Sequence, residues 1–175
     1  MKRGLTLIEV LIVIIFFTIL ASVSVYIFRI VLTSWSSQDE RAGISISIDF
    51  EIEKMVRELR EATAIQSVNL DEIRFTTDTD YIYYLYNAIE SYPPGFADPA
   101  LFYELKRTTL AGGIIAGTFT YGDGTVLIRD VVPPPTSDLA VNANTATIDL
   151  TVKREGETIH SRTEVRPRNI RIKKV

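Results

Sequence analysis

The longest apolar stretch of the chain lies close to its N-terminus. From Val10 to Phe28, nineteen residues carry no charge, and as a helix rising about 1.5 Å per residue they span about 28 Å, the thickness of a bilayer core. Lys2 and Arg3 precede this run, and Arg29 closes it. The pattern predicts one membrane-spanning helix with a cytoplasmic N-terminus and an exported remainder.

Two simpler interpretations of this segment are a cleaved secretory signal and a plain single-span anchor. A secretory signal has an apolar region of about 7–15 residues that ends in a small-x-small cleavage site. The run is longer than that, and only "ASVS" at 21–24 resembles such a site. A plain anchor explains neither Gly4 nor the carboxylate of Glu9, which stands at the start of the apolar segment.

After Arg29 the chain becomes amphipathic. "ISISIDFEI" at 44–52 also fits the alternation of a strand, but the spacing of three and four continues through "EKMVRELREATA" and favours a helix. We therefore predict a nearly continuous helix from Leu5 to about Ala64, about 90 Å long, with Gly43 as the favoured place for a bend. The apolar stripe of its second half is Ile44, Ile48, Ile52, Met55, Leu59 and Ala62.

From residue 66 onward the apolar period changes to two. This alternation, together with turn residues such as "YGDGT" and "REGE" and the proline-rich segments "SYPPGFADP" and "PPPTSD", predicts antiparallel strands. We therefore expect an α+β fold, in which a long N-terminal helix packs on antiparallel β-sheet. The predicted strands are 72–77, 80–86, 101–107, 117–121, 125–132, 146–153, 157–165 and a final "IRIKK".

Composition narrows the chemistry that the chain can perform. It contains no cysteine, and its formal net charge of −3 gives no reason to expect nucleic-acid binding. The single histidine, His160, stands in a predicted strand without a nucleophile motif, and no phosphate-binding loop or metal-binding histidine cluster is present. We predict no catalytic residue, no cofactor and no enzymatic activity.

Acidic residues cluster at several points of the predicted β region. The acidic residues Asp71, Glu72, Asp78, Asp80 and Asp123 can supply oxygens to calcium, but no spacing reproduces a calcium loop, so turn formation is favoured and no metal site is predicted.

Tyrosines occupy both faces of the strand 80–86, so one face is expected in the core and the other either there or at a subunit interface. The basic C-terminal stretch either is solvated or meets the acid-rich helix 49–61.

The N-terminal residues carry a specific resemblance. "KRG" followed by "LTLIEVLIVI" resembles the leader and mature start of the type IV pilin and type II secretion pseudopilin superfamily, although Leu5 stands where Phe or Met is commoner. The resemblance implies that a prepilin peptidase cuts between Gly4 and Leu5, and that the new amine of Leu5 is methylated. Glu9 is then the fifth mature residue.

The resemblance also gives Glu9 a role. A carboxylate in a membrane helix costs up to about 2.5–3.5 kcal/mol and is normally retained for a partner. Cleavage after Gly4 creates a cationic amine on every subunit, so Glu9 of one subunit can pair with the Leu5 amine of a neighbour and fix the register of assembly.

The order of the predicted strands and the ending Val165-Arg166-Pro167-Arg168-Asn169 most resemble the J-type minor pseudopilin and related minor pilins. The expected parts are a cleaved leader (1–4), a transmembrane helix (5–28), its amphipathic continuation (29–66) and a periplasmic β-rich domain (67–175).

The expected function is that of a structural minor subunit near the tip of a secretion pseudopilus. Its expected partners are other pseudopilins or pilins, the prepilin peptidase, the inner-membrane assembly platform and the membrane. The alternatives are a minor pilin of a type IV pilus and, from another class, a single-span membrane sensor or enzyme.

Overall fold

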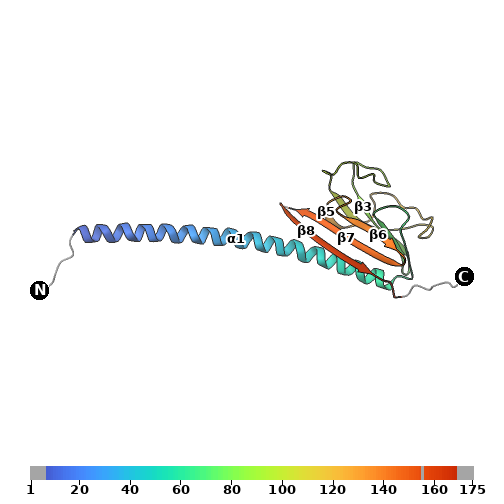
Figure 1. Cartoon of the computed structure of the whole chain (residues 1–175), viewed down its shortest axis with the longest axis horizontal. Coiled ribbons are helices and arrows are strands. Elements are labelled where there is room, and N and C mark those ends of the chain that lie inside the picture. Colours follow the sequence, from blue (N-terminus) through green and yellow to red (C-terminus); the bar gives the residue numbers. More distant parts are fainter. Residues whose placement is uncertain (1–6, 155, 169–175) are drawn as a thin grey trace. The chain divides into compact units, whose positions relative to one another are not determined.

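A computed structural model describes residues 7–154 and 156–168, without the side chains of residues 36–42. The chain divides into two compact units, Met1–Ile44 and Ser45–Val175, and helix α1 (Leu7–Glu61) contributes to both. The succession of helix and antiparallel strands confirms the α+β class. The strands of the described part (Figure 1) are β1 (Ala64–Gln66), β2 (Glu72–Thr76), β3 (Asp80–Tyr86), β4 (Tyr103–Thr109), β5 (Thr125–Val131), β6 (Asp138–Asn142), β7 (Thr145–Arg154) and β8 (Glu157–Val165).

The C-terminal part of α1 belongs to the second unit and is amphipathic as predicted. Ile48, Ile52, Met55 and Leu59 are all at most 6% exposed, because one side chain per helical turn faces the sheet. The stretch 44–52, whose isoleucines also fitted a strand, is therefore helical, and α1 includes Gly43 without interruption. Beyond the helix end, the backbone N–H of Arg168 donates to the carbonyl of Arg60 at 3.0 Å and satisfies one of its terminal acceptors.

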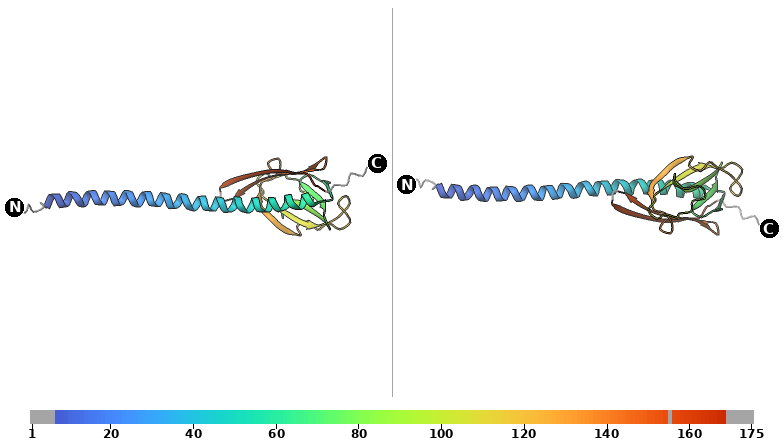
Figure 2. Two further views of the ribbon diagram at one scale, coloured as in Figure 1. Left: turned by 90° about the horizontal axis from the view of Figure 1, so that it is seen from below. Right: turned by 90° about the horizontal axis from the view of Figure 1, so that it is seen from above.

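The strands form one antiparallel sheet in the order β1-β2-β3-β4-β5-β7-β6. β5 and β6 pair with different parts of one edge of β7, and β8 pairs along the opposite edge. The connection between β5 and β7 is narrow, since it consists of the pair Val131 and Val152. The sheet curls, and the N–H of Leu139 in β6 reaches the carboxylate of Asp71 beside β2. Figure 2 shows strands on both sides of the C-terminal part of α1, as expected where a sheet curls around a helix.

Both faces of β2 and β3 are covered, which explains why β3 has little polar alternation and why the polar side chains of β2 are buried. Phe75 stacks on Tyr81 and Tyr83 on the face toward α1. On the opposite face Ile82 and Tyr84 pack with Leu110 and with the partly buried side chains of Tyr86, Ile114, Phe119 and Tyr121. The segment between β4 and β5 thus covers the second tyrosine face of β3, which had been considered as a subunit interface.

Most predicted strands are confirmed with small shifts in their bounds. The prediction at 117–121 is wrong, because Thr118 makes only an isolated bridge to Ala111 while Phe119 and Tyr121 serve as a cover for the core. β1 and β6 were not predicted: β1 has three residues, and β6 begins and ends with turn-forming Asp138 and Asn142. The final predicted strand, "IRIKK", lies outside the described residues.

Candidate functional site

The N-terminal part of α1 is an apolar surface. Leu7–Trp35 has 29 residues, none of them buried, and its most apolar 18-residue window has a mean hydropathy of 2.8, so the segment is long and apolar enough to cross a membrane. Large side chains such as Phe16, Phe17 and Phe28 are at least 65% exposed. In water such a surface costs about 25 cal/mol for each Å², so the segment is suited to a lipid or protein environment.

Four hydroxyls within this segment donate to carbonyls of their own helix. The hydroxyls of Thr18, Ser22 and Ser24 donate to the carbonyls four residues earlier, at 2.6, 2.8 and 2.8 Å. Thr33 does the same toward Arg29 at 2.7 Å. Because these bonds need neither water nor a second chain, the hydroxyls are compatible with an apolar environment.

Charged and amphipathic residues mark the two ends of the segment. Glu9 lies in the first turn of α1, where a carboxylate interacts favourably with the positive end of the helix dipole. At the other end Arg29 is followed by Trp35, which is 64% exposed, and tryptophan is typical of a membrane–water boundary. The predicted processing residues Gly4 and Leu5 lie outside the described residues, so the predicted proximity of Leu5 to a neighbour's Glu9 stays a prediction.

In the second unit a carboxylate joins α1 to the sheet. Glu58 accepts a hydrogen bond from the hydroxyl of Tyr83 at 2.6 Å and one from Nε of Arg107 at 2.9 Å. Arg107 also lies over the ring of Tyr81, 3.9 Å from its centroid. Burial, and then the hydrogen bond to Glu58, raise the pKa of Tyr83 well above its usual value, so this phenol stays a donor. The cluster fixes the rotation of the helix on the sheet.

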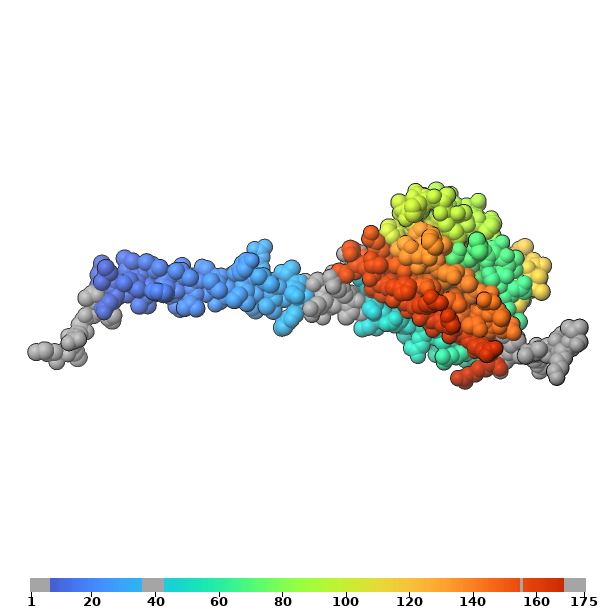
Figure 3. Space-filling model, in the orientation of Figure 1, coloured from blue at the N-terminus to red at the C-terminus, as the bar shows by residue number. Residues whose placement is uncertain are grey.

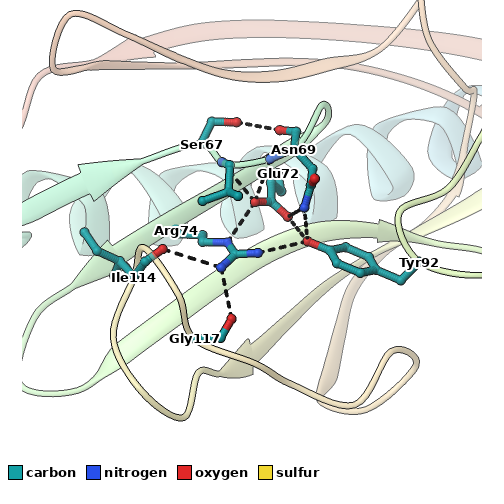
Figure 4. A network of polar contacts seen from close by, with 8 residues as sticks. Ser67, Asn69, Glu72, Arg74, Tyr92, Ile114 and Gly117 are labelled. Carbon is teal, nitrogen blue, oxygen red and sulfur yellow. Dashed lines mark hydrogen bonds and ion pairs between the residues drawn. The ribbon is translucent and has the colours of Figure 1, made fainter.

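A second polar cluster lies on the opposite face of β2 (Figure 4). Glu72 and Arg74 are both buried, and Nε of Arg74 donates to Glu72 at 2.8 Å. The same carboxylate accepts the backbone N–H groups of Val68 and Asn69 at 3.1 and 3.0 Å, and also the hydroxyl of Tyr92. Burial by itself would raise the pKa of Glu72, but the hydrogen bonds from Tyr92 and Arg74 outweigh it and hold that pKa below its usual value.

This network ties three separate loops to one strand. Arg74 donates to the hydroxyl of Tyr92 at 3.1 Å and to the carbonyl of Gly117 at 3.1 Å, so the segments around residues 69, 92 and 117 are held together. Every polar group involved is paired, and the arrangement therefore supports structure better than proton transfer. Sequence reasoning missed this cluster, although the opposite charges at i and i+2 of the strand "EIRFT" were a signal that Glu72 and Arg74 lie on one face of it.

The remaining candidates from the sequence have structural partners. His160 lies in β8 with Nε2 at 2.7 Å from Asp149 of β7, which adds a cross-strand contact on an exposed face. Asp80 accepts the hydroxyl of Thr76, and Asp78 that of Thr77. Among the described residues, no three His, Cys, Asp or Glu side chains come together in a way that suits a metal ion.

Comparisons with known proteins return no relatives: no family model, no curated protein and no solved structure matches this chain.

Proposed function

We propose that this chain is a non-enzymatic structural subunit of a type IV filament machine, a minor pseudopilin that assembles by packing its N-terminal helix. The observation that carries the proposal is Glu9 in the first turn of α1, at the start of the apolar 29-residue segment Leu7–Trp35 and shortly after the basic leader "KRG". The combination resembles a prepilin start.

The carboxylate of Glu9 is unfavourable in a membrane unless it has a partner. Inserted in a membrane, Glu9 costs up to about 2.5–3.5 kcal/mol. Hydrolysis of the Gly4–Leu5 peptide bond leaves the carboxylate on the released leader and a cationic amine on Leu5. When helices pack in an apolar bundle, that amine of one subunit lies within reach of Glu9 on the next, and the pair favours one axial register.

The second unit fits the role of selecting neighbours. Its helix–sheet contacts through Glu58 and its buried Glu72–Arg74 network make a rigid body at the end of α1. The described side chains form no group of His, Cys, Asp and Glu that suits a metal ion, and the proposal assigns this unit a binding role. In this proposal the unit is periplasmic, the helix starts in the inner membrane, and the partners are other pseudopilins, the prepilin peptidase and the assembly platform.

The test is processing. The full chain is co-expressed with a prepilin peptidase, and the N-terminus is determined by sequencing and intact mass. We expect Met1–Gly4 to be removed and Leu5 to carry one methyl group. Gly4→Val should abolish cleavage, because the larger side chain stands at the scissile bond, whereas Thr6→Ser should leave it unchanged.

A chain that still begins at Met1 beside an active peptidase contradicts the proposal. A strain that lacks this chain then distinguishes the pseudopilus from the pilus. Loss of protein export with normal surface pili supports a minor pseudopilin, and loss of surface pili with normal export supports a minor pilin.

A further inference from the structure

The outer face of the second half of α1 carries apolar side chains that the core does not use. Ile46 and Phe50 are 68% and 66% exposed. At about 100° of rotation per residue they lie on the side of the helix opposite the buried stripe of Ile48, Ile52 and Met55. Figure 3 shows that this part of the helix is uncovered at the surface beside the β8 strand.

A groove of about 530 Å³ runs along this face. It is lined by Phe50, Val56, Lys54, Arg57, Arg60 and Arg168. Glu53 and Glu61 also line it, so four cationic side chains face two acidic ones. The groove therefore combines the apolar side chains of Phe50 and Val56 with an excess of positive charge.

Three of these cations lack a close ion-pair partner among the described residues, although Glu53 and Glu61 line the same groove. Lys54 pairs with Glu51 at 3.9 Å, but across the described ranges neither Arg57, Arg60 nor Arg168 lies within 4.0 Å of a carboxylate. Elsewhere in the second unit, Arg74, Arg107, Arg129 and Arg154 are all paired.

The third arginine comes from a different part of the chain. Arg168 follows β8, and its backbone N–H donates to the carbonyl of Arg60 at 3.0 Å. This bond places the segment after β8 at the end of the helix, so that residues 57, 60 and 168 converge on one groove. The positive charge is therefore a product of the tertiary fold.

We propose that this groove is a docking site for an acidic, amphipathic helix of a neighbouring filament subunit. Its apolar residues would cover Phe50 and Val56, and its carboxylates would pair with Arg57, Arg60 and Arg168. A helix is the fitting shape because the stripe from Ile46 to Arg60 extends about 21 Å along a helix surface. Arginine suits such an interface, since its planar guanidinium binds carboxylates in a bidentate manner. That the partner is a filament subunit rests on the proposed function.

The experiment measures binding of a synthetic peptide to the full-length protein in neutral detergent micelles by fluorescence anisotropy. The probe is a helical peptide of about 20 residues, long enough to hold helical structure, with leucines on one face and glutamates beside them. A second peptide carries glutamine in place of each glutamate. We expect saturable binding of the Glu peptide, weakened by added salt, and at least about tenfold weaker binding of the Gln peptide.

Variants locate the site. The triple variant Arg57→Gln, Arg60→Gln, Arg168→Gln should weaken the Glu peptide at least about tenfold, and Phe50→Ser should weaken both peptides. The matched control is Arg129→Gln, which removes an exposed arginine of β5 and should leave binding unchanged. Near-ultraviolet circular dichroism of the tyrosines confirms that each variant remains folded.

Three results overturn the proposal: equal binding of the two peptides, unchanged binding by the folded triple variant, or displacement of the peptide by soluble short-chain phosphatidylglycerol but not phosphatidylcholine. The last would assign the groove to lipid headgroups. If the peptide does not bind but the leader Met1–Gly4 is removed normally, the docking site is refuted and the proposed function stands. If the peptide binds but the leader is never removed, the docking site stands and the assignment to a filament is refuted.

Discussion

Asp71 is a buried carboxyl at the point where the sheet closes. It is 8% exposed, and its Oδ1 accepts a hydrogen bond from the N–H of Leu139 in β6 at 3.5 Å. Burial raises the pKa of Asp71 to about 6, the Leu139 bond opposes this, and the nearby Asp138 adds to it. Asp71→Asn removes the charge, keeps an acceptor oxygen, and tolerates the left-handed backbone at φ 58°, which asparagine adopts readily.

The magnitude follows from the difference in pKa between the two states. The ordinary value is 3.8 and the folded value about 6, and about two units correspond to about 3 kcal/mol. The folded state binds the proton of Asp71 more tightly than the unfolded state does, so the protonated carboxyl favours folding. This contribution to the free energy of unfolding is fully present below pH 3.8 and is lost as the pH rises through 6. We expect Asp71→Asn to be about 3 kcal/mol more stable than the wild type near pH 8 and nearly equal to it near pH 3.5.

The assay is urea unfolding of the full chain in neutral detergent, measured between acidic and neutral pH. Near-ultraviolet circular dichroism reports on the second unit, because every tyrosine except Tyr26 lies between residues 81 and 121. The midpoint and slope together give the free energy of unfolding. The quantity compared is the difference between variant and wild type at each pH.

Two outcomes would refute this reasoning. A gain of equal size at acidic and neutral pH would show that packing, not ionisation, distinguishes the variant. A loss of stability near neutral pH would show that the carboxylate makes favourable contacts that outweigh its burial. The matched control is Asp78→Asn: a hydrogen bond from Thr77 lowers the pKa of this exposed carboxyl, so its neutralisation should give no gain at any pH.

The other predictions concern the buried network, the second unit and the apolar helix. Arg74→Ala should destabilise the chain by about 3–5 kcal/mol because Glu72 is left buried without its counter-charge; urea unfolding measures the loss, which adding Glu72→Gln should partly restore. A fragment of residues 29–175 should be soluble, with strand dominant in its far-ultraviolet circular dichroism, whereas a disordered spectrum would mean that the sheet needs partners to fold. Glu9→Val should leave membrane insertion intact but reduce co-purification with partner subunits, since the Leu5 amine loses its counter-charge; normal incorporation would remove the register role of Glu9.

Strands with strong period-two patterns and clear turns were predictable from the sequence. β3 and β8 agree with their predictions at both ends, because each is bounded by turn residues and carries its own alternation. The local sequence pattern gave a wrong prediction where the conformation of a segment depended on the strand that it packs against. β6, with the sequence "DLAVN", is a strand because it pairs along β7, and 117–121 is a cover because β3 offers it an apolar face.

The polar clusters of the second unit were beyond the reach of sequence spacing. Tyr92 lies 20 residues from Glu72, and Glu58 lies 49 residues from Arg107. Such pairs depend on which loops and strands become neighbours. A charged pair in a buried strand signals only that a partner must exist, since an unpaired buried charge is costly, and it does not identify that partner.

The sequence by itself determined the apolar helix of α1, the position of Glu9 at its start and the α+β class. These depend on runs and periods among residues adjacent in the chain, where hydrophobicity and backbone geometry act locally. The tertiary structure alone decided the curl of the sheet, the burial of Asp71 and the convergence of Arg57, Arg60 and Arg168 on one groove. The reason is physical: desolvation and Coulomb interactions depend on distances through space, and only the packed fold brings residues more than 60 positions apart within reach of each other.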